Sequence, residues 1–339
     1  MRRTKAGYLA IAAAAFGLSM ASVDAVAAPC DGPVESAKIT VMADWLPWAS
    51  QGPMMAAQLG GYYKDEGLEV EIIAPANPAD PIKLVARERV TFSLTYVPEV
   101  MLARETGIPV VSVAAFMRVL GSGLFYLSDS EVNGVADLKG KIVGVGPKQD
   151  AQAFLATTLA SGGLTKEDVQ VVDPGYAHVP MVVTGKVAAA HGLVFGEGVV
   201  ADLVLKGEGK PPVKWLLYRE HGVPAFYYQL LVGNEDWVKA NPNSTCRFLR
   251  ATQKGTEKWL ADPTDTLAVI SKGNEAFTPE QHRGIFDATT SHWKEADGTI
   301  FTQEVGLWKD AQDWAVAQGL ISVPADPSTY FTNDYNPKM

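Results

Sequence analysis

The feature that most limits how this chain can fold is a strand–helix alternation that occurs twice along it. In the first part of the chain the predicted strands are residues 38–43, 69–73, 92–96 and 110–116. After Leu127 the alternation begins again, and the predicted strands there are residues 141–145, 169–172 and 188–195. Strands separated by helices in this way are typical of parallel βαβ units. The restart predicts a second α/β lobe.

The C-terminal part follows a different pattern, because from about Asp236 onward helices are no longer separated by strands. The predicted helices are residues 236–260, 265–272, 279–293 and 303–318. Most tryptophans in this region recur at spacings that place them on apolar helix faces. We therefore expect most of them to lie in the core.

The N-terminus carries the pattern of a secretory signal peptide. Arg2, Arg3 and Lys5 precede an apolar stretch at residues 7–20, and Ala25-Val26-Ala27 supplies a small-x-small cleavage site. The apolar run is shorter than the roughly 20 residues that a membrane-spanning helix needs. We predict a signal peptide at residues 1–27 and a periplasmic mature protein.

The mature chain would be acidic and large enough for two domains. Removal of residues 1–27 leaves 312 of 339 residues and moves the net charge from −9 to about −11, because three bases and one acid are lost. This length favours two domains. The negative charge argues against nucleic acid and anionic membranes as partners. We expect a monomer.

Two cysteines, Cys30 and Cys246, remain after export into an oxidising compartment. They could pair and tie the mature N-terminus to the C-terminal region, but the sequence leaves open whether they lie within reach. Cys30 also raises the alternative of a lipoprotein. Pro29 directly before it fits a lipobox poorly.

Motifs for catalysis, cofactors or metals are missing from the sequence. There is no Gly-x-Ser-x-Gly, His-Glu-x-x-His, Cys-x-x-Cys or phosphate-binding Gly-x-x-x-x-Gly-Lys-Ser/Thr. Gly144-Val145-Gly146 follows a strand, but Gln149 stands where a dinucleotide fingerprint needs its third glycine. The five histidines are scattered, with none at i, i+4 spacing. We predict a protein that is not an enzyme and carries no cofactor or metal.

Aromatic side chains follow several of the predicted strands. Trp45 and Trp48 come after the first strand, Tyr96 after the third, and Phe195 with Glu197 after a strand of the second lobe. Ligands of open parallel sheets bind in the crevice beyond the carboxyl ends of the strands. Flat aromatic faces there favour a planar ligand. The alternative is that these rings are hydrophobic caps on the lobes.

A series of short segments, in a fixed order, carries a resemblance to a known family. The segments are Asp44-Trp45-x-Pro47, Gly61-Tyr62-Tyr63-x-x-Glu66-Gly67-Leu68-Glu69-Val70, Tyr96-x-Pro98-Glu99-Val100, Gly107-Ile108-Pro109-Val110-Val111, Asp137-Leu138-Lys139-Gly140-Lys141-Ile142-Val143-Gly144 and Gly222-Val223-Pro224. Together they resemble the solute-binding proteins related to thiamine-pyrimidine synthases, which include sulfonate and nitrate binders. The resemblance covers roughly residues 38–235.

The resemblance implies a two-lobed α/β periplasmic binding protein fold of type II, with parallel-rich sheets flanked by helices and a ligand cleft between the lobes. Two crossover segments, expected near residues 124–128 and 214–218, would let the lobes close like a hinged clamp. Lobe one would comprise residues 38–125 and 219–339, and lobe two residues 129–213. The implied partners are a small-molecule ligand and the membrane permease of an ABC importer.

Within the family, the chain looks most like the branch that binds formylaminopyrimidine, a thiamine precursor. Trp45, Tyr96 and Glu197 match the residues that line the pocket in that branch. Trp48 stands where the branch usually carries Asn, and Gln51 where it carries a downstream His. An aromatic carboxylate, a flavin or a sulfonate therefore remains an alternative ligand. The predicted ligand-binding residues are Trp45, Trp48, Tyr96, Glu99, Arg118, Lys148, Phe195, Glu197 and Phe226.

An enzyme of the same fold is the competing hypothesis. The related fungal synthases make the pyrimidine from pyridoxal phosphate and a histidine of the protein itself. They carry a cysteine-rich motif and no export signal, whereas this chain has two cysteines and the N-terminal pattern described above.

Overall fold

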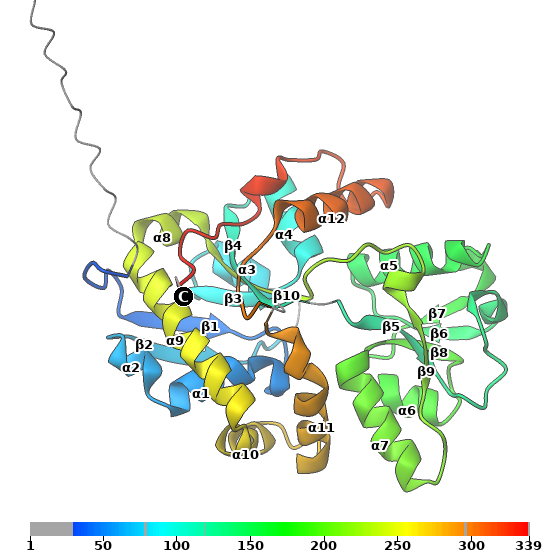
Figure 1. The fold of residues 1–339 in the computed structure, drawn as a ribbon. Helices are drawn as coiled ribbons and strands as arrows, with labels where there is room; N and C mark the ends of the chain where they lie inside the picture. The colour runs from blue at the N-terminus through cyan, green and yellow to red at the C-terminus, as the bar shows by residue number, and fades with distance from the viewer. Residues whose placement is uncertain (1–29, 78–79, 119, 295–296, 338–339) are drawn as a thin grey trace, which may run out of the picture.

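The computed structural model describes residues 30–77, 80–118, 120–294 and 297–337, and it contains two α/β lobes side by side (Figure 1). The predicted signal peptide at residues 1–27 lies outside the described residues. Each lobe is built on one five-stranded sheet with helices packed around it. The predicted fold class, a two-lobed α/β protein with parallel-rich sheets, is confirmed.

The sheet of lobe one has the strand order β2-β1-β3-β10-β4. Its strands are β1 (Lys38–Met42), β2 (Glu69–Ile73), β3 (Phe92–Thr95), β4 (Val110–Met117) and β10 (Gln229–Asn234). β1 is parallel to β2 and β3, whereas β10 is antiparallel to β3 and β4. Every residue of β10, an inner strand, is buried, and so is every residue of β4, an edge strand along which Phe301 and Phe331 form isolated bridges.

The sheet of lobe two repeats this arrangement with the order β7-β6-β8-β5-β9. Its strands are β5 (Ser122–Tyr126), β6 (Ile142–Gly144), β7 (Gln170–Val172), β8 (Ala189–Leu193) and β9 (Lys214–Leu217). β6 is parallel to β7 and β8, and β5 is antiparallel to β8 and β9. In each lobe, the antiparallel strand is the first one after the chain crosses from the other lobe.

The helices follow the same division between the lobes (Figure 1). Lobe one contains α1 (Gly52–Leu59), α2 (Tyr62–Asp65), α3 (Pro81–Ala86), α4 (Val97–Glu105), α8 (Glu235–Ala240), α9 (Pro242–Ala261), α10 (Thr264–Gly273), α11 (Pro279–Thr289) and α12 (Val305–Ala317). Lobe two contains α5 (Gln149–Ser161), α6 (His178–Val183) and α7 (Val199–Gly207). A π-helical turn, η4 (Val194–Gly198), precedes α7.

The lobe boundaries differ from the expected ranges of 38–125, 129–213 and 219–339 by one strand at each crossing. The chain leaves the first sheet at Met117 and enters the second at Ser122, so residues 122–126 belong to lobe two. It leaves the second sheet at Leu217 and re-enters the first at Gln229. The sequence predicts crossover segments near residues 124–128 and 214–218. In the structure these regions belong largely to β5 and β9, which pair with each other.

The long helix expected at residues 236–260 is in fact two helices. α8 ends at Ala240 and α9 begins at Pro242, with Asn241 between them. Proline has no amide hydrogen to continue the preceding helix, and it is favoured in the first turn of a new one.

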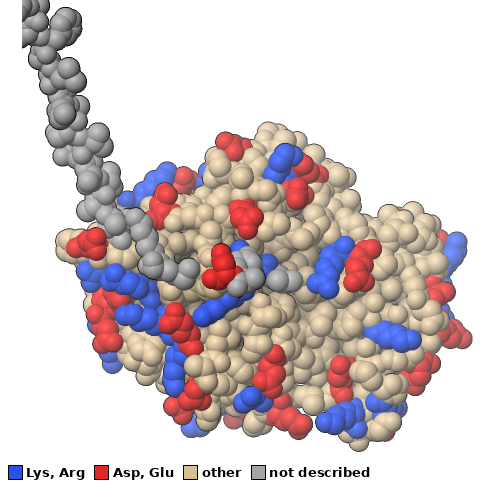
Figure 2. Space-filling view, in the orientation of Figure 1, with Lys and Arg blue, Asp and Glu red and all other residues tan. Residues whose placement is uncertain are grey.

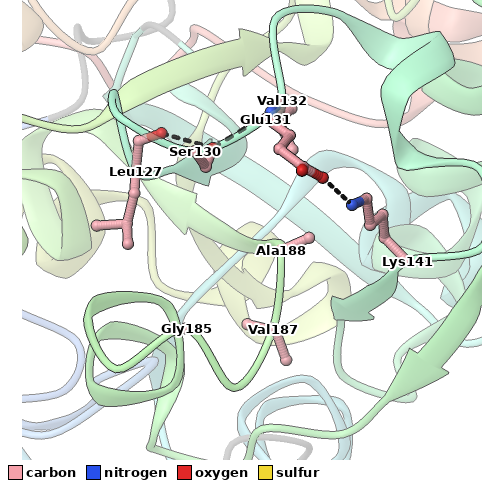
Figure 3. Close-up of a pocket in the computed structure, with 8 residues that line it drawn as sticks. All are labelled: Leu127, Ser130, Glu131, Val132, Lys141, Gly185, Val187 and Ala188. Atoms are coloured by element: carbon pink, nitrogen blue, oxygen red, sulfur yellow. Dashed lines mark hydrogen bonds and ion pairs between the residues drawn. The ribbon is translucent and has the colours of Figure 1, made fainter.

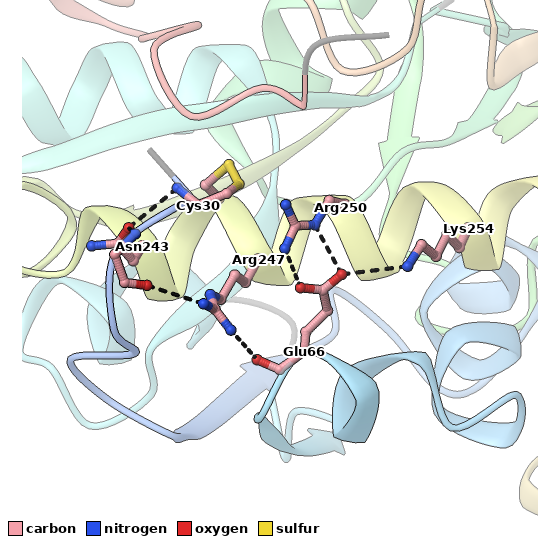
Figure 4. A network of polar contacts seen from close by, with 8 residues as sticks. Cys30, Glu66, Asn243, Arg247, Arg250 and Lys254 are labelled. Carbon is pink, nitrogen blue, oxygen red and sulfur yellow. Dashed lines mark hydrogen bonds and ion pairs between the residues drawn. A yellow bond between two sulfur atoms is a disulfide. The ribbon is translucent and has the colours of Figure 1, made fainter. Parts of the chain in front are cut away.

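Helix α9 is the element to which the N-terminal arm, residues 30–37, is attached (Figure 4). A disulfide joins Cys30 to Cys246, with 5.4 Å between their Cα atoms, so the pairing that the sequence left open is formed. Glu35 accepts hydrogen bonds from the backbone N–H and the side chain of both Asn243 and Ser244 in the first turn of α9. The arm therefore caps the helix as well as being crosslinked to it.

The turn before β2 is fixed to the same helix by a buried carboxylate, Glu66 (Figure 4). Its side chain pairs with Arg250, whose Nε lies 2.8 Å from Oε1, and with Lys254 at 3.4 Å. The Arg247 guanidinium donates to the Glu66 carbonyl at 3.1 Å. These contacts hold α9 against lobe one, where it packs on α1 and α2.

On the face shown in Figure 2, basic and acidic side chains are interspersed over both lobes. Several surface charges form i, i+4 pairs along helices, such as Lys258 with Asp262 on α9 and Lys309 with Asp313 on α12. Within the described ranges, none of the helices has the length and apolar character needed to cross a membrane.

Candidate ligand-binding site between the lobes

The lobes meet along a group of residues that we call the interlobe seam. Lobe one contributes Asp44, Trp45, Trp48, Tyr96, Glu99 and Tyr228, and lobe two contributes Lys148, Asp150, Tyr176, Phe195 and Glu197. Most of these residues follow strands or begin helices, as expected for the carboxyl edges of the two sheets. The seam unites seven of the nine predicted ligand-binding residues: Trp45, Trp48, Tyr96, Glu99, Lys148, Phe195 and Glu197.

On the lobe-one side of the seam, the buried carboxylate of Asp44 connects several of these residues. Asp44 lies two residues after the end of β1 and is 3% exposed. Tyr96 donates a hydrogen bond to its Oδ2 atom at 2.6 Å, and Gln51 donates to Oδ1 at 3.0 Å. The Oε1 atom of Gln51 accepts in turn from the backbone N–H of Trp48 at 2.8 Å.

Burial governs the protonation of these groups. Burial raises the pKa of Asp44 above its ordinary value, although the hydrogen bonds from Tyr96 and Gln51 act in the opposite direction. Burial and the neighbouring Asp44 carboxylate together raise the pKa of Tyr96 well above its ordinary value. The Tyr96 hydroxyl therefore keeps its proton and remains a donor.

An ion pair connects the two lobes across the seam. The Nζ atom of Lys148, at the N-cap of α5, lies 3.0 Å from Oε1 of Glu99 in the first turn of α4. The same ammonium lies 5.2 Å from the centre of the Tyr96 ring, within the range of a cation–π contact. Burial lowers the pKa of Lys148, but the charge and hydrogen bond of Glu99, together with the charges of Asp150 and Asp44, raise it overall, so the ammonium stays charged.

Aromatic rings from both lobes pack against one another around this ion pair. Trp45 contacts Tyr176 of lobe two with 4.8 Å between ring centres, and Trp48 faces Phe195 at 6.4 Å. Phe195 packs edge-on against Tyr228 at 5.4 Å. Trp48 also covers Gly196, where an added Cβ would lie 2.9 Å from the indole ring, so the close approach of the lobes requires glycine there.

Glu197 is positioned by the π-helical turn after β8. Its Oε2 atom accepts a hydrogen bond from the backbone N–H of Leu193 at 2.9 Å, which fixes the carboxylate at the end of the strand. Burial and then the charge of Asp44 raise the pKa of Tyr228, and Glu197 adds to this effect. The Glu197 carboxylate therefore acts on Tyr228 across the seam.

Helices also pack between the lobes. α11 of lobe one lies against α7 of lobe two, and an added Cβ at Gly284 would lie 2.8 Å from Val199. On another side, the indole N–H of Trp314 on α12 donates to Thr157 on α5 at 3.2 Å. The lobes are thus in contact on several sides of the seam.

Two of the predicted ligand-binding residues are not part of the seam. Arg118 donates from Nη1 to the Thr302 carbonyl at 2.5 Å, and its guanidinium lies over the Tyr227 ring at 5.3 Å. Phe226 stacks on Phe154, with 6.0 Å between ring centres, in a cluster with Trp314. Arg118 thus contacts the C-terminal part of lobe one, and Phe226 packs where α5 meets α12.

The sequence interpretation did not select Asp44, Tyr228, Asp150 or Tyr176 as site residues. Asp44 had a detectable signal, because a carboxylate directly after an apolar strand lies at the edge where ligands bind. Tyr228 follows two other aromatic residues, and nothing in the sequence distinguishes it from them. Tyr176 lies in a loop and is 70% exposed, and it contacts Trp45 only because the lobes are brought together.

A partly buried imidazole lies behind the lobe-two side of the seam. His191, on β8, bonds through Nδ1 to the Tyr218 hydroxyl at 2.8 Å. Desolvation, followed by the nearby His178 and Lys148, lowers the pKa of His191 to about 3. The ring is therefore neutral at physiological pH. In the part of the chain that the structure describes, no cluster of three or more His, Cys, Asp or Glu side chains could hold a metal ion.

A separate cavity of about 240 Å³ lies in lobe two, away from the seam (Figure 3). Leu127, Glu131, Lys141 and Val187 are among the residues that line it, and Lys141 pairs with Glu131 at 2.7 Å on one side of it. It contains none of the predicted ligand-binding residues, so it does not enter the proposed site.

Comparison with known proteins gives relatives of two kinds. The chain is 28% identical over 299 residues to the formylaminopyrimidine-binding protein of Halalkalibacterium halodurans, covering 87% of this chain and 89% of that protein. It is also 28% identical over 309 residues to the 4-amino-5-hydroxymethyl-2-methylpyrimidine phosphate synthase THI13 of Saccharomyces cerevisiae, covering 88% of this chain and 87% of that one.

Among solved structures, the periplasmic aliphatic sulphonate binding protein SsuA of Escherichia coli has the same fold. It superposes with a TM-score of 0.67 at 13% identity, covering 87% of this chain and 92% of that one. The two-lobed architecture is thus the periplasmic binding protein fold. The sequence pattern of the NMT1/THI5-like proteins matches residues 48–266, which include most of the seam and both crossings, and the chain belongs to that family.

Proposed function

We propose that this protein is the periplasmic solute-binding component of an ABC importer. Its ligand is a small planar heterocycle rich in N–H donors, specifically a thiamine pyrimidine precursor such as formylaminopyrimidine. The lobes close over the ligand at the seam, and a membrane permease receives it. The protein binds its ligand without converting it.

The charge balance of the seam is the observation that carries this proposal. Four carboxylates lie there, on Asp44, Glu99, Asp150 and Glu197, and the Lys148 ammonium is paired with Glu99. Burial raises the pKa of Asp44, and burial with the charge of Glu99 raises that of Asp150. Further negative charge is therefore unfavourable at the seam, whereas N–H donors from an aminopyrimidine would satisfy carboxylate oxygens.

The aromatic residues support the same ligand class. Trp45 and Tyr96 lie at the seam from lobe one, and Tyr176 and Phe195 from lobe two. A flat ring held between such faces gains stacking energy and is shielded from water when the lobes close. The relative named as a formylaminopyrimidine-binding protein supports this reading.

An anionic ligand has less support. A carboxylate or sulfonate would need a cationic clamp, and Arg118 and Lys148 were the candidates for it. Arg118 contacts Thr302 and Tyr227, and Lys148 is paired with Glu99. The sulphonate-binding protein shares the fold at 13% identity, which says nothing about the ligand of this chain.

A pyrimidine synthase is the second candidate, favoured by the similarity to the yeast synthase. The cysteine-rich motif that the resemblance implies for such enzymes has no counterpart here. Both cysteines of the chain are joined to each other between the N-terminal arm and α9. This observation favours a binding protein.

Calorimetric titration of the mature protein separates the candidates. We expect formylaminopyrimidine to bind with one site per chain, and an alkanesulfonate and an aromatic carboxylate of similar size to give no binding heat. Recovery of the pyrimidine unchanged after hours with excess protein, judged by mass spectrometry, supports a binding protein. Tight binding of the sulfonate alone would overturn the ligand assignment, and more than stoichiometric product would identify an enzyme.

A further inference from the structure

Asp44 is a buried carboxylate whose hydrogen bonds come from neutral groups. Both of its oxygens accept hydrogen bonds, one from the Tyr96 hydroxyl and the other from the Gln51 amide. Asp44 is only 3% exposed. Burying a carboxylate that is hydrogen-bonded only to neutral donors costs more folding free energy than burying an apolar residue of similar size. Its two partners lead to two different contacts with lobe two.

The first path runs through Tyr96. The hydrogen bond to Asp44 at 2.6 Å fixes the phenol ring of Tyr96. The Lys148 ammonium of lobe two lies over this ring, 5.2 Å from its centre. Lys148 then pairs with Glu99, one turn along the helix that Tyr96 caps. The orientation of Tyr96 thus determines the surface that the lobe-two cation meets.

The second path runs through Gln51. Its amide nitrogen donates to Asp44, so its amide oxygen is turned toward the backbone N–H of Trp48 at 2.8 Å. This bond closes the turn between β1 and α1 and sets the position of the Trp48 indole. The indole then packs on Phe195 and Gly196 of lobe two.

We propose that Asp44 is the positioning residue of the interlobe site, holding Tyr96 directly and Trp48 through Gln51 in the orientation that receives lobe two. The role rests on the proposed function in that it takes the seam to be the ligand site. The positioning itself concerns contacts between the lobes and can be measured without ligand. Asp44 acts on a ligand through Tyr96 and Trp48.

The test uses the full mature chain labelled with 5-fluorotryptophan and observed by ¹⁹F NMR without ligand. Trp48 is assigned by the resonance that disappears in Trp48→Phe, and Trp308, which packs on Tyr330 and Phe331, serves as a distant reference. Asp44→Ala and Gln51→Ala should both shift or broaden the Trp48 resonance and leave Trp308 in place. Tyr96→Phe should leave the Trp48 resonance in place, because it breaks only the first path.

Glu66→Ala is the matched control, since Glu66 is another buried carboxylate of lobe one but is paired with Arg250 and Lys254 outside the seam. It should lower the melting midpoint without moving the Trp48 resonance. Asp44→Asn keeps the shape of the side chain and provides a folded variant if Asp44→Ala does not fold. An amide presents one acceptor oxygen to two donors, so it should perturb at least one path.

Affinity gives the second measurement. With formylaminopyrimidine as the probe, Asp44→Ala should weaken binding at least tenfold. Adding Gln51→Ala or Tyr96→Phe to it should cost less than the same change costs in the wild type. A Trp48 resonance that stays in place in Asp44→Asn and Gln51→Ala would overturn the positioning role. If the wild type fails to bind the pyrimidine while the resonance shifts as expected, the ligand assignment fails and the positioning role stands.

Discussion

The Nζ atom of Lys148 lies 3.0 Å from Oε1 of Glu99, which joins the N-terminus of α5 in lobe two to the first turn of α4 in lobe one. The side chains are 37% and 19% exposed, so the pair is partly shielded from water. An opposite-charge contact between two domains favours the arrangement in which they touch. The pair should therefore hold the lobes together even without a ligand.

Lys148→Met should shift the lobes toward an open arrangement. A partly shielded pair is worth about 1 kcal/mol, so the closing equilibrium should change about fivefold. Small-angle X-ray scattering of the ligand-free protein should show a larger radius of gyration. Exchange of the two charges in Lys148→Glu/Glu99→Lys should restore part of the closure. Lys141→Met, which breaks the exposed pair with Glu131 inside lobe two, should leave the scattering curve unchanged.

Trp45→Ala should weaken binding of formylaminopyrimidine by about 1–3 kcal/mol, the range measured for stacking of a base on an aromatic side chain. Calorimetric titration gives this value directly. A melting midpoint close to that of the wild type would exclude global unfolding as the cause, because Trp45 is only half-buried.

Glu197→Gln should weaken binding of an aminopyrimidine more than that of a ligand without N–H donors. The reason is that a carboxylate is a stronger acceptor than an amide. Titration of both ligands into the variant measures the difference. Arg118→Ala should lower stability, because Arg118 holds the Thr302 segment, and it should change affinity little. The reverse result, with Glu197→Gln unaffected and Arg118→Ala unable to bind, would support an anionic ligand.

His191 should make the protein less stable as the pH falls. Its pKa is about 3 in the folded protein against 6.5 for an ordinary histidine, so only the unfolded chain takes up this proton in most of that interval. The contribution of neutral His191 is complete above about pH 6.5 and declines progressively toward pH 3. Asp44 and Asp150, with raised pKa values, act in the opposite direction, so variants must be compared at each pH.

Urea unfolding of His191→Gln at several pH values between 7.5 and 4.5 isolates this effect. The stability difference between wild type and variant should move in favour of the variant as the pH falls. His221→Gln, in the crossing between β9 and β10 where its imidazole bonds to Ser161, controls for the loss of a histidine elsewhere. If the free energies of unfolding of the wild type and His191→Gln changed with pH in parallel, the lowered pKa of His191 would be contradicted.

Removal of the disulfide in Cys30→Ser/Cys246→Ser should lower the free energy of unfolding by about 2–5 kcal/mol, because the bond closes a long loop in the unfolded chain. The residues it joins are 216 positions apart. Urea unfolding with and without a reductant gives the same comparison on the wild type. The hydrogen bonds of Glu35 to Asn243 and Ser244 should keep the arm on α9 in the folded variant.

Much of the fold could be predicted from the sequence because its strands are regular. The seven strands expected from apolar runs between helices are present in the structure, within a few residues at each end. β10 (Gln229–Asn234) was not predicted as a strand, and neither were β5 and β9, since Ser122–Tyr126 and Lys214–Leu217 are short segments at the crossings between the lobes. Their pairing with each other depends on the crossings between the lobes, which leave no local signal.

The sequence predicts the residues of the candidate site whose position follows from the end of a strand. It does not predict those whose position depends on the direction of the side chain. Trp45 and Tyr96 follow β1 and β3, so the topology alone brings them to the seam. Arg118 follows β4 in the same way, but its side chain points toward Tyr227 rather than Tyr228, on the side away from the seam. Tyr176 reaches Trp45 only through the relative position of the lobes.

The disulfide has a consequence for whether Cys30 can carry a lipid anchor. Besides its bond to Cβ, a cysteine sulfur can form one further covalent bond. In Cys30 this is the disulfide bond to Cys246. A thioether to a lipid would need the same atom, so the crosslinked and lipid-modified forms exclude each other. In the crosslinked form Cys30 is a fixed point on lobe one. When the lobes open and close as proposed, Cys30 stays with lobe one while lobe two moves.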